Sequence, residues 1–447
     1  MNELVRLQPD SLDLNANGVA RHEGKIVFVR DALPGETVVA NIVRRKPRFD
    51  VAQTISIERE SNQRVRPPCA HFGVCGGCSM QHLAPAAQLA VKQRVLEDQL
   101  LHIGAVRPER VLRPLAGPDF GYRYRARLSA RFVIKKGHAL VGFREKGSSF
   151  VANMTQCPVL PPIASALLMP LRGLVDSLIL KKRIPQIEVA VSETDRAGAD
   201  RGLRVSLVFR HMEPLPPPDL ENIRRFGLQH EAQIWLQSKG PETIRPLDPD
   251  DDQLFYTLPE FNLHMPFHPS DFTQVNMPVN RAMLSQALRL LDAKPDEAVA
   301  DLFCGLGNFS LPIARSGAQV TGVELSQTMV HRAGEGAAAN GLSGQARFVA
   351  QNLFKIDSHA WQQLGRFDKL LIDPPREGAF EVCQAISAAP AGFRPARIVY
   401  VSCNPATLAR DAGLLVNEGG YRLVEAGIVN MFPHTSHVES MARFELV

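Results

Sequence analysis

The sequence predicts a multidomain α/β protein with a small β-barrel over residues 1–60, a central α+β domain over residues 61–260 and a doubly wound sheet over residues 261–447. The chain of 447 residues is longer than one ordinary domain of roughly 100 to 200 residues. Short strands and turns occupy its beginning, whereas strands alternate with helices near its end. Between them lies a mixed pattern that carries a cluster of cysteines.

The first 60 residues contain short apolar runs bounded by turn residues. Strands are predicted at residues 18–20, 24–29, 37–43 and 51–57, and the sequence Leu-Pro-Gly-Glu at 33–36 is predicted to be a turn. Short strands at such close spacing are typical of a small barrel resembling an OB-fold.

The central domain combines helix and strand signals. A helix is predicted over residues 86–101, where apolar residues recur at helical spacing, and we interpret it as a packing helix. Strands are predicted at residues 125–134 and 203–209. The proline-rich residues 214–218 are predicted to form a loop.

From residue 262 onward, strands alternate with helices. Strands are predicted at residues 298–303, 319–324, 346–350, 369–372 and 398–402. Helical connections between strands indicate a parallel, doubly wound sheet, which binds its ligands at the carboxyl ends of the strands.

Positive charge is concentrated in the first third of the chain. Residues 41–66 hold seven Arg or Lys against three acids, and residues 121–147 hold eight against one, although the net charge of the chain is +5. Such concentrated charge suits a polyanion, because each neutralised phosphate releases counterions. The alternative is a solvated, arginine-rich strand face.

The sequence carries no sign of export or membrane insertion. Its first residues are acidic where a signal peptide would be apolar, and the longest apolar stretch, 159–180, contains Arg172, Asp176 and prolines. We therefore expect a cytoplasmic protein without a membrane partner. No obligatory protein partner is evident, so a monomer is expected.

The cysteine spacing points to a metal site. Seven cysteines are present, and Cys69, Cys75 and Cys78 are close in sequence, while Cys157 lies downstream beside Pro158. Structural zinc usually takes paired knuckles, whereas a remote ligand followed by proline is typical of cluster-binding ferredoxin runs. We favour a [4Fe-4S] cluster over zinc. A radical enzyme is disfavoured, because the chain has no C-x3-C-x2-C triplet.

A cofactor site is predicted after the strand at 298–303. Gly305 and Gly307 permit close approach of a ligand to the backbone, but Ser310 stands where a dinucleotide fingerprint has its third glycine. Glu324 ends the next strand and can accept both ribose hydroxyls, and Asn352 after the third strand can bind an adenine edge. This set favours S-adenosylmethionine over NAD.

Cys403 is a candidate nucleophile at the end of the strand 398–402. A nearby base would be needed, and the candidates are His434, His437 and Glu439. The sequence Asp-Pro-Pro-Arg at 373–376 resembles the Asp-Pro-Pro-aromatic motif of amino-methylating enzymes, but arginine replaces the aromatic residue. The chemistry is therefore expected at Cys403. Cys304 and Cys383 are interpreted as packing residues.

Three motifs resemble the RNA uridine-C5 methyltransferase family, most closely its bacterial branch that acts on 23S ribosomal RNA. They are Ser-Cys-Asn-Pro-Ala-Thr-Leu-Ala-Arg-Asp at 402–411, His-Val-Glu-Ser at 437–440 and Asp-Leu-Phe-Cys-Gly-Leu-Gly-Asn at 301–308. Residues 10–60 resemble the RNA-binding TRAM barrel. The barrel and the four clustered cysteines separate this branch from relatives that act on tRNA, which lack both.

The resemblance implies a role for each candidate residue. Cys403 would add to C6 of the base and Glu439 would remove the C5 proton. The residues implied to hold the cofactor or frame its pocket are Gln274, Phe303, Asn308, Glu324, Asn352 and Asp373. The implied cluster ligands are Cys69, Cys75, Cys78 and Cys157. The helix at 86–101 would pack on the catalytic domain.

Other functions remain compatible with these residues. C5-methylation of a tRNA uridine or of an RNA cytosine uses the same thiolate chemistry, and base identity depends on contacts at N3 and C4 that sequence does not display. A non-catalytic RNA-binding redox sensor is a further alternative, disfavoured by Cys403, Glu439 and the glycine loop.

Overall fold

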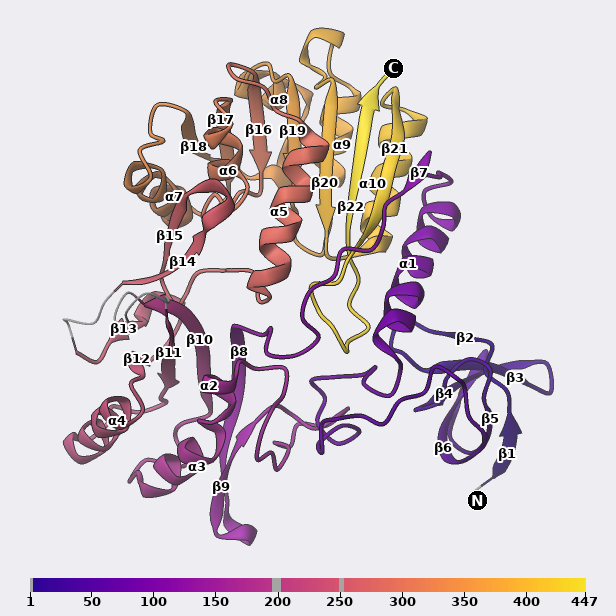
Figure 1. Cartoon of the computed structure of the whole chain (residues 1–447), viewed down its shortest axis with the longest axis vertical. Coiled ribbons are helices and arrows are strands. Elements are labelled where there is room, and N and C mark those ends of the chain that lie inside the picture. Colours follow the sequence, from indigo (N-terminus) through magenta and orange to yellow (C-terminus); the bar gives the residue numbers. More distant parts are fainter. Residues whose placement is uncertain (1–2, 195–201, 249–252) are drawn as a thin grey trace.

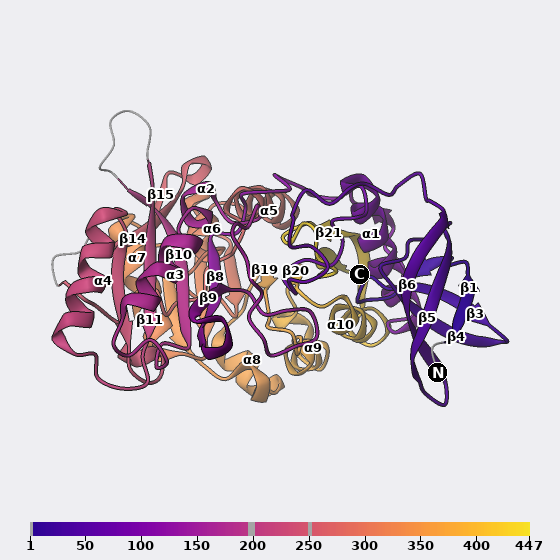
Figure 2. The same cartoon turned by 90° about the horizontal axis from the view of Figure 1, so that it is seen from below.

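Three large sheets organise the computed structural model, which describes residues 3–194, 202–248 and 253–447. Figure 1 shows the carboxyl-terminal sheet at the top, the central sheet at lower left and the amino-terminal barrel at lower right. Seen from below, the barrel and the central sheet lie on opposite sides of the molecule (Figure 2). Within the described residues, no helix combines the length and apolar character needed to cross a bilayer.

The amino-terminal sheet buries one side of each strand against a small apolar core. Its strands are β1 (Leu4–Leu7), β2 (Ser11–Leu12), β3 (Gly18–His22), β4 (Lys25–Arg30), β5 (Thr37–Arg45) and β6 (Phe49–Arg59), in the order β1-β5-β6-β4-β3-β2. Alternate residues such as Val27 and Val29 are fully buried, as expected of strands with one solvated face. β3 to β6 overlap the predicted strands, whereas the short β1 and β2 were not predicted.

Helix α1 (Pro85–His102) connects the barrel to the carboxyl-terminal sheet and lies against α10 (Pro405–Asn417) and β21 (Tyr421–Val429) (Figure 1). Leu96 and Leu100 belong to the same core as Leu408 and Ala412 of α10. Burying each leucine contributes roughly 2 kcal/mol, which fixes the helix on this sheet. The short strand β7 (Arg110–Val111) then joins the edge of the sheet beside β21.

The central sheet has helices packed on its apolar side. Its strands are β8 (Arg125–Val133), β9 (His138–Gly142), β10 (Gln186–Thr194), β11 (Gly202–Arg210), β12 (Gln233–Gln237) and β13 (Arg245–Pro246). The helices are α2 (Pro162–Ser165), α3 (Leu168–Ser177) and α4 (Pro217–Gln229). The prediction of a loop at 214–218 is wrong for its last two residues, because α4 begins at Pro217. Proline is tolerated in the first turn of a helix, since the backbone N–H groups there have no partner within the helix.

The carboxyl-terminal half alternates strands and helices after the hairpin of β14 (Leu254–Leu258) and β15 (Leu263–Phe267). The helices are α5 (Met277–Leu291), α6 (Ser310–Arg315), α7 (Gln327–Ala339), α8 (Ser358–Leu364), α9 (Phe380–Ser387) and α10 (Pro405–Asn417). The strands are β16 (Ala298–Leu302), β17 (Gln319–Glu324), β18 (Ala346–Ala350), β19 (Lys369–Ile372), β20 (Arg397–Ser402), β21 (Tyr421–Val429) and β22 (Glu439–Leu446). Single 3-10 turns are η1 (Ile134–Lys136), η2 (Pro241–Thr243), η3 (Pro259–Phe261), η4 (Leu353–Lys355) and η5 (Ala391–Phe393).

The strand order of this sheet is β18-β17-β16-β19-β20-β22-β21-β7. The strands from β18 to β20 are parallel, as predicted. The prediction of a wholly parallel sheet is wrong, because β22 runs antiparallel to both β20 and β21. The loop 430–438 that leads from β21 into β22 contains no crossover helix, and a direct connection of this kind produces antiparallel neighbours.

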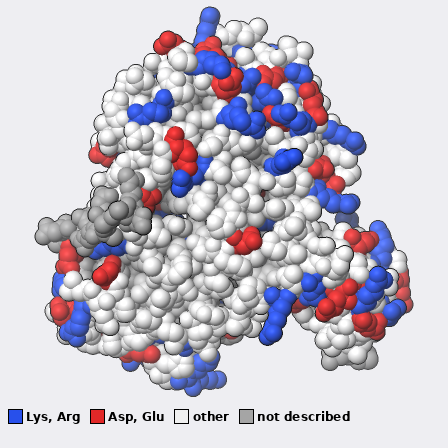
Figure 3. Space-filling view, in the orientation of Figure 1, with Lys and Arg blue, Asp and Glu red and all other residues white. Residues whose placement is uncertain are grey.

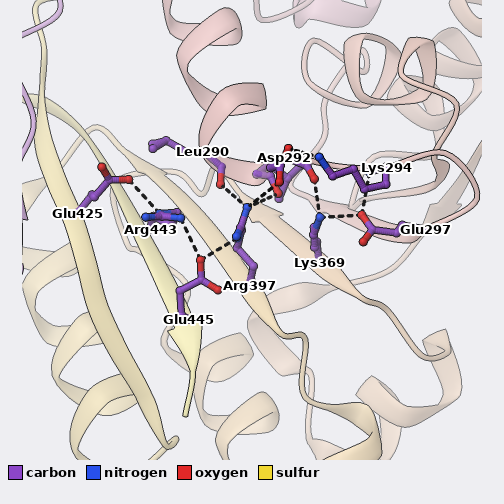
Figure 4. Close-up of polar contacts among 10 residues, drawn as sticks. Leu290, Asp292, Lys294, Glu297, Lys369, Arg397, Glu425, Arg443 and Glu445 are labelled. Atoms are coloured by element: carbon purple, nitrogen blue, oxygen red, sulfur yellow. Dashed lines mark hydrogen bonds and ion pairs between the residues drawn. The ribbon is translucent and has the colours of Figure 1, made fainter.

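An ion-pair network joins the strands at the edge of the sheet where β19 and β20 begin (Figure 4). Arg443 Nε lies 2.9 Å from Glu425 Oε2, and Arg397 Nε lies 2.8 Å from Glu445 Oε1. Lys369 pairs with Glu297 at 2.7 Å. The network lies opposite the carboxyl ends of the parallel strands, so we assign it to holding β20, β21 and β22 in register.

Candidate active site

A cavity of about 590 Å³ lies at the carboxyl ends of the parallel strands. Pockets for small ligands usually measure about 300 to 1,000 Å³, so a nucleoside-sized cofactor and a base fit here. Residues that follow β16, β17, β19 and β20 all contribute to its wall. Among the predicted site residues, the wall includes Gln274, Phe303, Asn308, Glu324, Asp373, Cys403 and Glu439.

The loop after β16 brings backbone close to the cavity. Phe303, Gly305 and Gly307 have φ values of 64°, 54° and 84°, so two of these left-handed positions are glycines. A Cβ at Gly307 would lie 3.3 Å from Phe348 Cζ, which leaves little room for a side chain. Phe303 also adopts a left-handed φ, which is sterically unfavourable for a residue with a side chain. Such strained residues often occur at functional sites.

Two polar side chains of the predicted cofactor site are held in place by hydrogen bonds. Glu324 Oε2 accepts from Gly305 N at 3.3 Å, and its other oxygen accepts from Ser326 N at 3.0 Å. Asn308 Oδ1 accepts from Tyr256 Oη and from Asn280 Nδ2, each at 3.1 Å. These contacts fix a carboxylate and an amide in the cavity wall.

Asn352 is placed differently from the other predicted cofactor residues. Its neighbours Gln351 and Leu353 line the cavity, whereas Asn352 does not. The side chain of Asn352 instead caps η4, since its Oδ1 accepts from Phe354 N at 3.0 Å. The structure therefore does not bring this amide into the wall.

Cys403 and Glu439 come together because β22 is antiparallel to β20. Ser402 and Ser440 are opposite each other in this pairing, and Ser440 Oγ donates to the Ser402 carbonyl oxygen at 3.3 Å. Cys403 follows the first serine and Glu439 precedes the second, so both residues reach the same end of the sheet. Both line the cavity.

Burial shapes the acidity of both groups. Burial raises the pKa of the Cys403 thiol to about 11, and the nearby Glu439 and Asp373 add to this while Arg376 opposes it. Burial also raises the pKa of Glu439 to about 8, with Asp373 adding to the effect and Arg376 and Lys92 opposing it. A carboxyl group that titrates near neutrality is suited to proton transfer.

The two candidate histidines have different positions. His437 lines the cavity, and its Nδ1 lies 3.4 Å from Arg376 Nη2. His434 is not part of the wall; its ring stacks on Phe120 at 4.4 Å, and its Nδ1 lies 3.2 Å from Gln88 Nε2. His437 is therefore the histidine placed to assist catalysis.

Arg376 was not among the predicted site residues, although it lines the cavity. Asn404 Nδ2 donates to its carbonyl oxygen at 3.0 Å, which ties the Asp-Pro-Pro-Arg turn to the residue after Cys403. The sequence signal that could have identified Arg376 as a site residue was its position in the Asp-Pro-Pro-Arg motif. Cys383 is fully buried, and Cys304 is nearly so, although Cys304 also lines the cavity.

The predicted cluster ligands Cys69, Cys75, Cys78 and Cys157 line one small cavity of about 20 Å³. Burial raises the pKa of Cys78 to about 11 and of Cys157 to about 12, and neighbouring cysteines add to both shifts. Within residues 3–194, 202–248 and 253–447, no three His, Cys, Asp or Glu side chains converge closely enough to bind a single metal ion. The structure thus gathers the four sulfurs around one space without forming a single-ion site.

Comparisons with known proteins agree with this geometry. The sequence model of the tRNA (uracil-5-)-methyltransferase family matches residues 257–445, and that of the TRAM domain matches residues 9–55. The 23S rRNA (uracil(1939)-C(5))-methyltransferase RlmD of Bordetella avium is 57% identical over 440 residues, covering 98% of this chain and 90% of that protein. The protein of the same name from Cupriavidus metallidurans is 56% identical over 445 residues, covering 98% and 94%.

A solved structure shares the fold over the whole chain. It is the crystal structure of Pyrococcus abyssi tRNA (uracil-54, C5)-methyltransferase in complex with S-adenosyl-L-homocysteine, with a TM-score of 0.72 at 23% identity. The match covers 99% of this chain and 100% of that chain.

The doubly wound sheet with its glycine loop and strand-end cavity defines an S-adenosylmethionine-dependent methyltransferase. The chain belongs to the RNA uracil-C5 methyltransferase family. The predicted family and the predicted TRAM barrel are confirmed.

Proposed function

We propose that the protein methylates C5 of a specific uridine in 23S ribosomal RNA, with S-adenosylmethionine as methyl donor. The observation that carries this proposal is the placement of Cys403 and Glu439 in the wall of the cavity that the glycine loop also lines. The names of the relatives from Bordetella avium and Cupriavidus metallidurans support the choice of substrate.

The residues of the wall fit the cofactor. The carboxylate of Glu324 is oriented by Gly305 and Ser326 and would accept the ribose hydroxyls. The other residues proposed to contact or frame the cofactor are Gln274, Phe303, Asn308 and Asp373. Asn352 leaves this set, because its amide caps η4 outside the wall. When bound, S-adenosylmethionine supplies an electrophilic methyl group. The C5 atom of uracil is too weak a nucleophile to attack this group unless the base is first activated.

Cys403 would provide the activation. Its thiolate adds to C6, so that a sulfur–carbon bond forms and the electrons of the C5–C6 double bond make C5 nucleophilic. The thiol must first release its proton to solvent, and the guanidinium of Arg376 favours the thiolate that remains. After C5 has gained the methyl group, Glu439 takes the C5 proton, the double bond forms again and the bond from C6 to sulfur breaks.

Mapping 5-methyluridine in 23S ribosomal RNA from a strain that lacks this gene tests the function directly. We expect one 5-methyluridine to disappear and to return when the gene is restored. Loss of a 5-methylcytidine, or of a 5-methyluridine in tRNA, would identify another substrate. An unchanged set of methylated bases, together with intact RNA binding by the protein, would instead favour a non-catalytic sensor.

The barrel and the basic stretch at 121–147 are proposed to hold the RNA. Arg44, Arg48, Lys135 and Lys136 are exposed, whereas Arg125 is turned inward and donates to the carbonyl oxygens of Pro269 and Asp271. On the face drawn in Figure 3, charged side chains lie mainly around the rim and a broad uncharged area covers the middle. Phosphate contacts on this face are therefore expected at the rim.

We also propose that Cys69, Cys75, Cys78 and Cys157 hold a [4Fe-4S] cluster. Their shared cavity supports this, because a cluster of four irons spaces its ligands more widely than a single ion does. Thiols buried to this degree also need a bound cation to lose their protons. A bound cluster would cross-link the loop at 69–78 to Cys157.

Metal content tests the cluster. We expect anaerobically purified protein to be brown and to hold about four irons per chain, the number that four cysteine ligands imply. Cys157→Ser should lose most of this iron, whereas Cys403→Ala, which removes a thiol outside the cluster cavity, should retain it. Iron and zinc are measured by elemental analysis. Stoichiometric zinc without iron would contradict the proposal.

A further inference from the structure

Helix α1 buries two polar side chains in the same stripe as its leucines. Its buried residues are Gln88, Lys92, Leu96 and Leu100, which recur every four positions along one face. The leucines account for docking on the sheet, but Lys92 is 1% exposed, and lysine is almost never buried unless it is paired. The end of the helix that carries Gln88 and Lys92 therefore has another partner.

That partner is the segment 430–438, which joins β21 to β22. Lys92 Nζ donates to Asn430 Oδ1 at 2.7 Å and to the Phe432 carbonyl oxygen at 2.8 Å. Gln88 Oε1 accepts from His434 N at 2.9 Å. In Figure 1 this segment, drawn in yellow, projects below the sheet beside the first turns of α1.

The same segment leads into the active site. Phe432 and His437 line the cavity, and Glu439 follows as the first residue of β22. The position of this carboxyl group therefore depends on a loop that α1 holds through Lys92 and Gln88. The amino-terminal half of the chain thus contributes to the active site through two side chains that never reach the cavity.

Lys92 also acts on Glu439 through charge. Burial lowers the pKa of Lys92 to about 7, and the neighbouring Glu439 opposes this change. The charged groups that act on Glu439 are Asp373, which disfavours its ionised form, and Arg376 and Lys92, which favour it. Lys92 in turn contributes to lowering the pKa of His434 and His437, where burial is the main cause.

We propose that Lys92 is a positioning residue for methyl transfer: from α1 it fixes the segment 430–438, and its protonated form favours the ionised state of Glu439. This inference rests on the proposed function, because it requires Glu439 to remove the C5 proton. The two roles make different predictions, since loop placement alone alters the rate equally at every pH, whereas the charge alters the pH dependence.

The test replaces Lys92 with methionine, which has a similar length and no charge. We expect the rate of release of the RNA adduct to fall by about 10- to 100-fold near neutral pH, the range that misplacing or neutralising part of a general-base system produces. KM for S-adenosylmethionine should change little, because the cofactor residues are untouched. The rising limb of the pH–rate profile should move to higher pH, since loss of a nearby cation makes Glu439 harder to ionise.

Two further variants separate charge from packing. Lys92→Arg keeps the charge and should restore the position of the pH limb. Arg94→Met removes a cation from the same helix, but the side chain of Arg94 is 78% exposed. This variant should therefore behave as wild type. If Lys92→Met does not fold, Lys92→Gln, which keeps a donor for Asn430, must show the same shift in pH.

Single-turnover reactions with a radiolabelled 23S ribosomal RNA fragment, sampled between pH 6 and pH 10 and resolved on denaturing gels, provide the measurement. A Lys92→Met profile that keeps the wild-type pH dependence would overturn the inference. Glu439→Gln is run beside it. If that variant releases RNA normally, the base assignment itself fails; if it retains the adduct while Lys92→Met releases RNA like wild type, the role of Lys92 fails alone.

Discussion

Methyl transfer and every covalent protein–RNA species are expected to disappear in Cys403→Ala. No later step can occur before sulfur adds to C6, so we expect activity to fall by on the order of 10⁴-fold or more, as when other covalent nucleophiles are removed. The thiol is only partly buried, so the free energy of unfolding should change by less than about 1 kcal/mol. Cofactor binding should survive, because the predicted cofactor residues lie on other strands.

Transfer of a labelled methyl group to RNA, calorimetric titration with S-adenosylmethionine and intact-mass analysis check this result. Cys383→Ala is the matched control, since it removes a thiol that is fully buried in the core outside the cavity. It should lower stability and retain methylation. Residual adduct formation in Cys403→Ala, or a linked peptide that contains Cys304, would show that another sulfur attacks the base.

The sequence was sufficient to predict the five parallel strands of the carboxyl-terminal sheet but not the two strands that follow them in the chain. Apolar runs revealed the strands from β16 to β20, and the helices between them implied parallel pairing. Residues 421–429 and 439–446 lie beyond the last predicted strand, and no pattern there indicated that β22 inserts between β20 and β21. This insertion produces the pairing of Ser402 with Ser440, which brings Cys403 and Glu439 into one cavity.

The remaining differences concern polar residues with structural partners. A count of apolar residues along α1 could not identify Gln88 and Lys92 as part of its buried face, because their partners lie more than 300 positions away. Asn352 follows the third strand, two residues after β18 ends, yet its amide caps a local turn. Sequence position thus located the strand ends correctly, whereas the direction of each side chain depends on tertiary contacts.

Two carboxyl groups, Asp373 and Glu439, line the cavity and differ in their charged neighbours. Asp373 follows a parallel strand and lies in the same wall, but burial alone raises its pKa to about 7. Glu439 has two cations acting on it, Arg376 and Lys92, so its ionised form is compensated from two directions. Two carboxyl groups near each other with different cation neighbours can take different protonation states at one pH.

Glu439→Gln is expected to accumulate a methylated RNA that remains covalently attached to Cys403. The amide cannot accept the C5 proton, so addition and methyl transfer proceed while release slows by about 10² to 10⁴-fold. In the wild type, the raised pKa of Glu439 means that release should increase with pH through about 8, because the base must be ionised. The variant should lose this increase of the release rate with pH. Because the amide resembles the protonated carboxyl, the variant should be as stable as wild type below about pH 4.5, where Glu439 is protonated in the folded and unfolded states, and increasingly more stable than wild type as the pH rises toward 8.

Denaturing gels with labelled RNA and labelled cofactor, followed by mass analysis of the linked peptide, measure the trapped species. His437→Gln is the matched control, because His437 lines the same cavity and carries the competing base. We expect it to slow turnover without trapping the adduct, since Glu439 remains able to take the proton. If His437→Gln traps methylated RNA and Glu439→Gln releases it, the imidazole is the base and the carboxyl group serves to orient it.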